Sequence, residues 1–237
     1  MAKNSRVRST TTTHLYICAL LALGCVAYGA DILMSPSSSS ASTCKMCGQE
    51  PVLTVASSTT AMIQDAARHV VPTEVMWRTA SGDLDSWDDL VGHPTVLAFV
   101  YTRCTNPLRC AAVTKSLGRL QASLAEAHLA DQVQIRLATL DAEYDTPERL
   151  TAFAAAHGLS TGATAAQVMA VDQLSLDVLP QAIGLQAQWR DGEITGHASQ
   201  VFLLDRTGRV AVVHPLAQPD LEVVMTQVQA LLAEAGP

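Results

Sequence analysis

The sequence predicts an α/β fold in which helices flank a central mixed sheet. Two observations point to it. Short apolar runs of the kind found in buried strands alternate with longer stretches whose apolar residues recur every three or four positions. Hydrophobic residues also make up 49% of the 237 residues, which is enough for the packed core of one sizeable domain.

The predicted domain opens with a strand, a helix and a second strand. Residues 95–101 (TVLAFVY) form a continuous apolar run, typical of a strand that is buried on both faces. Residues 133–140 are predicted to form the second strand. Between them, a helix is indicated by apolar residues at helical spacing: Val113, Leu117, Leu120, Leu124 and Ala127.

A second helix has well-marked ends, and a hairpin follows it. Thr146 suits the N-cap, Pro147 the first helical position, and Gly158 lies just past the expected end. Residues 201–204 and 210–213 are short apolar runs joined by a polar, glycine-containing turn. They therefore predict a β-hairpin.

The last predicted element is an amphipathic helix that starts after residues 218–220 (QPD). The order strand, helix, strand, helix, hairpin, helix is that of a thioredoxin-like fold. We expect residues 73–237 to form this fold as one domain.

Charge and motifs exclude several classes of function. The chain carries 15 Lys and Arg against 22 Asp and Glu, a net charge of −7, without a basic stripe in the sequence. Nucleic-acid binding is therefore not expected, because it needs clustered basic residues. The sequence also lacks a Gly-rich phosphate loop, a G-x-S-x-G elbow and an H-E-x-x-H motif, so it gives no support for a nucleotide-binding protein or a hydrolase.

The amino terminus predicts a targeting segment. Lys3, Arg6 and Arg8 precede an uncharged run whose apolar part, residues 15–30, is somewhat short of the ~20 residues that span a bilayer comfortably. A basic start followed by an apolar stretch is typical of a signal peptide or signal anchor. We assign residues 1–34 to it.

Processing of this segment is left open. Residues 21–25 (LALGC) resemble a lipoprotein box, so we expect either an uncleaved or lipidated anchor or a cleaved signal peptide. Positive charges stay on the inner side of the membrane, which would place the body on the periplasmic, extracytoplasmic side of a single-pass anchor. Residues 35–72, with the run SPSSSSAST, are expected to form a flexible tether.

Two cysteines follow the first predicted strand. Cys104 and Cys110 are six positions apart, which within one helix would put them about 9 Å apart along the axis. Pro107 prevents this, because it pushes Asn106 out of helical space and suits a first helical turn. We therefore expect Cys104 in a loop that folds back on Cys110 in the opening turn of the helix.

Such a pair has both a chemical and a structural interpretation. A helix amino terminus and the nearby Arg103 and Arg109 would stabilise thiolates, which suits disulfide exchange or binding of a soft ion such as Cu(I). A structural disulfide, or two buried thiols, is the alternative.

Three stretches resemble the SCO1/SenC family. They are residues 96–110 (VLAFVYTRCTNPLRC), residues 140–150 (LDAEYDTPERL), and residues 196–199 (GHAS) ahead of residues 202–208 (FLLDRTG). The resemblance covers most of residues 70–237. It implies a membrane-anchored thioredoxin-fold protein that faces the periplasm or the mitochondrial intermembrane space.

The resemblance also implies a site and a role. In the family, two cysteines and a distal histidine bind copper for delivery to cytochrome c oxidase. By position these would be Cys104, Cys110 and His197, which would bind Cu(I) or Cu(II), and Asp141 matches the family's aspartate after the second strand. The implied partner is an oxidase subunit or another copper or thiol client protein.

The spacing of the cysteines departs from the family pattern, which is usually C-x3-C, whereas this chain has C-x5-C. A metal-independent thiol–disulfide oxidoreductase using Cys104 and Cys110 is therefore the alternative function, because it needs only close approach of the sulfurs. A family member that only binds partners is a third interpretation.

A second pair, Cys44 and Cys47, lies in the tether as C-x2-C. A zinc knuckle would need two further ligands nearby, and haem attachment would need His at position 48, which is Gly48. A local disulfide, a second redox or copper-passing pair that reaches the main one, and an intermolecular contact remain as interpretations.

Overall fold

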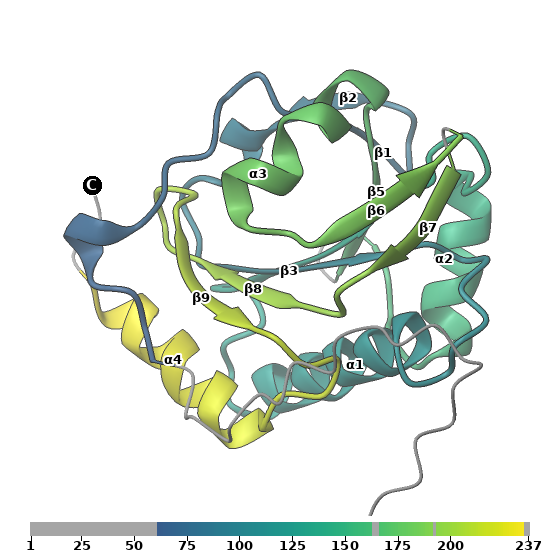
Figure 1. Ribbon diagram of the computed structural model, residues 1–237. Coiled ribbons are helices and arrows are strands. Elements are labelled where there is room, and N and C mark those ends of the chain that lie inside the picture. The colour runs from purple at the N-terminus through teal and green to yellow at the C-terminus, as the bar shows by residue number, and fades with distance from the viewer. Residues whose placement is uncertain (1–60, 163–165, 192, 235–237) are drawn as a thin grey trace, which may run out of the picture. The chain divides into compact units, whose positions relative to one another are not determined.

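The computed structural model describes residues 61–162, 166–191 and 193–234 (Figure 1). The predicted anchor, most of the predicted tether, and Cys44 and Cys47 lie outside the described residues. Within the described ranges, no helix has both the length and the apolar character needed to cross a membrane.

A seven-stranded mixed sheet forms the centre of the domain, with the strand order β2-β1-β5-β4-β3-β8-β9. The three middle strands β5, β4 and β3 are parallel, and the others pair antiparallel. The strands are β1 (Met76–Thr79), β2 (Leu84–Ser86), β3 (Thr95–Val100), β4 (Gln134–Thr139), β5 (Gln167–Val171), β8 (Val201–Leu204) and β9 (Val210–His214). A separate two-stranded sheet consists of β6 (Ala187–Arg190) and β7 (Glu193–His197).

Helices lie on both faces of the large sheet (Figure 1). One face is covered by α1 (Cys110–Glu126), α2 (Pro147–Ala156) and α4 (Leu221–Ala233), and the other by α3 (Leu179–Ile183) with the β6–β7 ribbon. Three short 3₁₀ helices complete the described structure: η1 (Asp65–Ala67), η2 (Trp87–Leu90) and η3 (Gln173–Asp177).

Side chains of β3 alternate between two hydrophobic cores because successive residues of a strand point to opposite faces. Val96, Ala98 and Val100 join the core beneath α1, α2 and α4, whereas Leu97 and Phe99 join the core on the α3 side. All six residues of β3 are buried, as the unbroken apolar run predicts. This strand fixes where the following loop leaves the sheet.

The two helices on either side of β4 in sequence approach each other closely. A Cβ placed on Gly118 of α1 would collide with the carbonyl oxygen of Gly158, so the position has no room for a side chain. Gly158 itself follows α2 with φ of +81°, a left-handed conformation that ends the helix at the predicted place.

The predicted strands, helices and hairpin are confirmed, with ends that shift by only a few residues. Thr146 caps α2 by accepting a hydrogen bond from the Arg149 N–H, and Pro147 is its first residue. The sequence did not predict β5–β7 or α3. These elements have five residues or fewer, too few for a periodic apolar pattern to stand out.

Candidate functional site

The loop at the carboxyl end of β3 carries Cys104 and leads into α1. Residues 101–104 form a turn, closed by a 3.1 Å hydrogen bond from the Cys104 N–H to the Tyr101 carbonyl. A second turn follows, in which the Arg109 N–H donates to the Asn106 carbonyl at 3.1 Å.

The helix begins later than the sequence predicts. α1 starts at Cys110, so Pro107 lies in the loop and not in the first helical turn. The Asn106 side chain accepts a 2.9 Å hydrogen bond from the Leu108 N–H, and Arg109 has non-helical angles (φ −114°, ψ −104°). This local turn displaces the start of the helix. The prediction that Cys104 lies in a loop and Cys110 in the opening turn is confirmed.

Cys104 is partly exposed, and its surroundings favour the thiolate form. Burial by itself would raise the pKa of its thiol, but hydrogen bonds from the backbone N–H and the side chain of Cys110, from Asn106 and from Tyr101 outweigh burial and lower the pKa. The first N–H of α1 thus points at the Cys104 sulfur, which is the thiolate position that a helix amino terminus favours. Arg103, expected to assist the thiolate, instead forms an ion pair with Asp141.

Cys110 has the opposite character. Its side chain is fully buried, and this burial raises the pKa of its thiol above the ordinary value. Both cysteines are free thiols, and each affects the pKa of the other. The buried Cys110 sulfur lies 3.5 Å from Nε2 of His197, a residue 87 positions later in the chain.

His197 is the last residue of β7 and only 5% exposed. Its Nδ1 lies 2.7 Å from the carbonyl oxygen of Ala198, which can only accept, so Nδ1 carries the ring proton. Burial lowers the pKa of the imidazole and so favours the neutral ring, although the Ala198 carbonyl partly opposes this. Nε2 therefore presents its lone pair to the Cys110 sulfur.

Tyr101 packs against this pair. Its ring meets the His197 ring edge to face, with centroids 5.5 Å apart. Burial, together with the neighbouring Cys104, raises the pKa of Tyr101 to about 12, so its hydroxyl keeps its proton and can donate to Cys104. Tyr101 could not be recognised as a site residue from the sequence, because a tyrosine at the end of an apolar run is typical of a core position.

Two aspartates after β4 hold the turn in front of Cys104. Asp141 accepts from Arg103 Nε at 2.8 Å and pairs with Arg103 Nη2 at 2.7 Å. Asp145 accepts from the Thr102 N–H at 2.9 Å and from the Thr102 hydroxyl. The sequence indicates Asp141 only through the family resemblance, and Asp145 stands in it simply as the residue before the predicted cap Thr146.

The structure brings Cys104, Cys110 and His197 to one corner of the sheet. Across the described residues, however, no three His, Cys, Asp or Glu side chains already stand in an arrangement that could hold a metal ion. Of the three, Cys110 and His197 are in direct contact, through the 3.5 Å approach of the Cys110 sulfur to Nε2.

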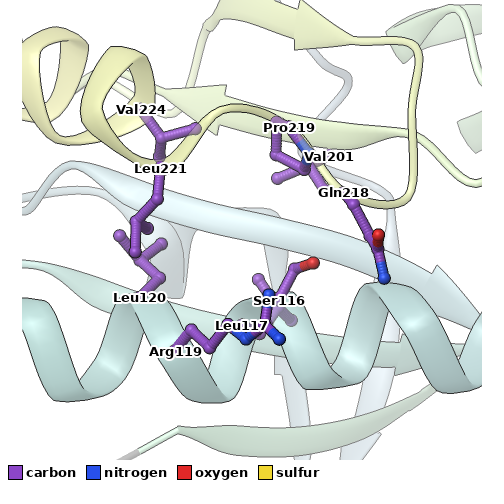
Figure 2. Close-up of a pocket in the computed structure, with 9 residues that line it drawn as sticks. All are labelled: Ser116, Leu117, Arg119, Leu120, Val201, Gln218, Pro219, Leu221 and Val224. Carbon is purple, nitrogen blue, oxygen red and sulfur yellow. The ribbon is translucent and has the colours of Figure 1, made fainter. Parts of the chain in front are cut away.

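Two histidines away from this corner have structural partners. His214 Nε2 lies 2.8 Å from Oε1 of Gln227 in the buried interior, and His157 Nδ1 lies 2.8 Å from the Phe153 carbonyl. A separate cavity of about 180 Å³ lies between α1 and the start of α4 (Figure 2). Its lining is largely apolar and contains neither cysteine nor histidine: Ser116, Leu117, Arg119, Leu120, Val201, Gln218, Pro219, Leu221 and Val224.

A family model described as SCO1/SenC matches residues 77–233, which is well over half of the chain. The chain belongs to the SCO1/SenC family. The match spans the loop with both cysteines, the aspartates after β4 and His197. No curated protein matches the sequence significantly.

Solved structures of SCO1/SenC proteins share the fold. The SCO1/SenC family lipoprotein from Bacillus anthracis str. Ames is 20% identical (TM-score 0.59, 69% of this chain and 95% of that chain). BsSco, a member of the Sco family of cytochrome c oxidase assembly proteins with an identified disulfide switch, is also 20% identical (TM-score 0.59, 73% and 99%). Copper-bound ScoI from Bradyrhizobium japonicum is 18% identical (TM-score 0.51, 68% and 99%).

Proposed function

We propose that this SCO1/SenC protein binds copper through Cys104, Cys110 and His197. It would pass the ion to a cytochrome c oxidase subunit, or to another copper or thiol client, during assembly of a respiratory copper centre. The observation that carries the proposal is the 3.5 Å approach of the Cys110 sulfur to His197 Nε2, with the ring proton held on Nδ1 by the Ala198 carbonyl.

The donor set suits copper. Two thiolates and a neutral imidazole nitrogen are ligands that soft Cu(I) prefers, and the imidazole also suits Cu(II). A thiol must lose its proton to bind a metal, so copper uptake releases protons. Cys104, whose pKa is lowered, would lose its proton first. The buried Cys110 thiol would lose its proton only when the charge of the bound ion offsets the cost of a buried thiolate.

Membrane attachment is part of the proposal. The basic and apolar pattern of residues 1–34 supports a single-pass or lipid anchor, with the domain on the periplasmic side. The related structure from Bacillus anthracis carries the description of a lipoprotein, which supports attachment in the same sense.

A Cu(I) titration against a competing chelator tests the copper proposal. We expect the affinity of the reduced full-length protein to fall about 100-fold or more in His197→Ala, because a ligand has a larger effect than the 10–100-fold of a supporting residue. His93→Ala, which removes an exposed histidine, is the control and should match the wild type. Equal affinities in wild type and His197→Ala would overturn the proposal.

A second candidate function is thiol–disulfide exchange without metal, favoured by the contrast between the two thiols. The Cys104 thiolate would attack a client disulfide, form a mixed disulfide and release one client thiolate. Cys110 would then lose its proton and attack the Cys104 sulfur. This second attack releases the second client thiol and leaves the client reduced by two electrons and the protein oxidised to a Cys104–Cys110 disulfide.

Trapping the mixed disulfide with a client protein separates the roles of the two cysteines. Cys110→Ser should accumulate a mixed disulfide through Cys104 with a disulfide-containing model protein such as insulin, whereas Cys104→Ser should accumulate far less. If neither variant is trapped and the wild type does not reduce insulin, this second function is excluded.

Cys44 and Cys47 would then act as a second pair that reduces or reloads the main pair. The double variant Cys44→Ser/Cys47→Ser tests this role. Unchanged thiol reactivity and copper occupancy at Cys104 and Cys110 would contradict it.

A further inference from the structure

The turn that carries Cys104 is held at both of its central residues. Thr102 donates its N–H to Asp145 Oδ2 at 2.9 Å and its hydroxyl to Asp145 Oδ1. Arg103 donates from Nε to Asp141 at 2.8 Å. Both acceptors come from the loop between β4 and α2, so this loop determines where the turn lies.

Asp145 is the deeper of the two aspartates, with only 1% of its surface exposed. Its Oδ2 also accepts from the Thr139 hydroxyl at the end of β4, and its own N–H donates to the Asp141 carbonyl at 2.7 Å. The Thr139 hydroxyl oxygen in turn accepts from the Asp141 N–H at 3.0 Å. Asp145 therefore joins the end of β3 to the end of β4.

The partners of Asp145 are unusual for a buried carboxylate. In the described part of the chain no salt bridge reaches it, and its oxygens receive hydroxyl and backbone donors alone. A buried carboxylate is costly unless its oxygens are satisfied, so these donors must stay in place. Two of the three belong to Thr102, two residues before Cys104.

We propose that Asp145 is a positioning residue for Cys104. By holding Thr102, it determines where Cys104 stands before α1, whose first residue is Cys110. Residues 105–108 then form their own turn within the larger C-x5-C loop. The inference rests on the proposed function, since positioning has a purpose only if the two sulfurs act together. It applies equally to copper binding and to disulfide exchange.

The equilibrium for closing the Cys104–Cys110 disulfide measures this positioning directly. Each disulfide formed converts one oxidised glutathione into two reduced molecules, so the equilibrium constant reports how well the fold holds the sulfurs together. Full-length protein is equilibrated in glutathione buffers, quenched and alkylated. Cleavage after Arg103, Arg109 and Lys115 then gives separate peptides for Cys104 and Cys110, which distinguishes this pair from the other cysteines.

Four variants make the test specific. Asp145→Asn and Thr102→Val should each lower the equilibrium constant about fivefold or more, the change expected for one lost hydrogen bond. Thr102→Ser keeps the hydroxyl and should retain the wild-type value. Asp205→Asn alters another buried aspartate, at the opposite end of the sheet, and should lower stability without changing the equilibrium constant.

Thr102→Val decides the question if Asp145→Asn does not fold, because Thr102 is partly exposed and the change removes a single hydrogen bond. An unchanged equilibrium constant in folded Thr102→Val would overturn the positioning role. An equal fall in Asp205→Asn would also overturn it. Loss of copper binding tests the proposed function and not the positioning role of Asp145, because the disulfide equilibrium is measured without copper.

Discussion

Two buried aspartates, Asp145 and Asp205, lie at opposite ends of the central sheet. Asp145 holds the turn that follows β3, whereas Asp205 follows β8, whose last residue pairs with Thr95 at the start of β3. Each accepts hydrogen bonds from a threonine hydroxyl and from a backbone N–H, Thr207 supplying both for Asp205. In these contacts the two ends are alike.

They differ in their charged partners. Asp205 pairs with Arg68 at 2.9 Å and with Arg209 at 3.0 Å, and Arg68 also pairs with Glu234 at 2.6 Å. Arg68 precedes β1 and Glu234 follows α4. The ion pairs around Asp205 therefore connect the first and last elements of the domain. The Asp145 end joins the turn of Cys104 to the end of β4. We therefore expect the Asp205 end to affect mainly stability and the Asp145 end to affect mainly the Cys104–Cys110 pair.

The largest expected effect is at the Asp205 end. Arg68→Met should lower the free energy of unfolding by about 3 kcal/mol, because it leaves the buried Asp205 without one of its cations. Urea denaturation measures this, with Arg78→Met at an exposed position as the control, expected to change little. A loss below about 1 kcal/mol would show that this end does not serve stability as described.

Gly118→Ala tests a contact that belongs to neither end. The new methyl group would collide with the Gly158 carbonyl oxygen, so α1 and α2 would have to separate. We expect the free energy of unfolding to fall by about 2 kcal/mol, as for overpacked cores. Arg119→Ala, at the next and exposed position of α1, is the control, and equal stability of the two variants would contradict the close approach.

The pH dependence of stability tests the contribution of the Asp205 carboxylate. Burial would raise the pKa of Asp205, but hydrogen bonds from Thr207 and Arg68 outweigh burial and lower the pKa. The unfolded chain therefore takes up this proton first as the pH falls from about 5 to 3, and the wild type loses stability there. Asp205→Asn should be less stable at neutral pH and should show a flatter curve in this window. Parallel curves would contradict the assignment.

The smallest expected effect comes from removing the threonine hydroxyl that donates to each of the two aspartates. Thr207→Val removes the hydroxyl that Asp205 accepts from and should cost about 1 kcal/mol of stability without changing the Cys104–Cys110 disulfide equilibrium. Thr102→Val makes the same change at Asp145 and should shift that equilibrium. If the two variants behaved alike in both measurements, the division between the two ends would fail.

The sequence predicted the parts of the fold whose signal is local. The apolar run of β3, the Thr146 cap of α2 and the β8–β9 hairpin each depend on neighbouring residues. The short β6–β7 ribbon was not predicted, because its strands are only partly buried and carry few apolar residues. The later start of α1 follows from the Asn106 turn, a side-chain contact that Pro107 by itself does not reveal.

The site was predictable only in part. Spacing indicated that Cys104 and Cys110 could meet, but the approach of His197 to Cys110 joins residues 87 positions apart, and only the family resemblance suggested it. The contrast between the two thiols depends on burial and on the first N–H of α1, which a sequence does not specify. The role of Asp145 could not be predicted, because its contacts with Thr102 and Thr139 join residues that are not neighbours in the sequence.

X-ray absorption at the copper edge of the loaded, reduced protein tests the central claim most directly, because it counts the atoms bound to the ion. We expect two sulfur ligands and one nitrogen ligand in the wild type, and loss of the nitrogen in His197→Ala with both sulfurs kept. The same spectrum in the two proteins, or a single sulfur ligand in the wild type, would contradict it.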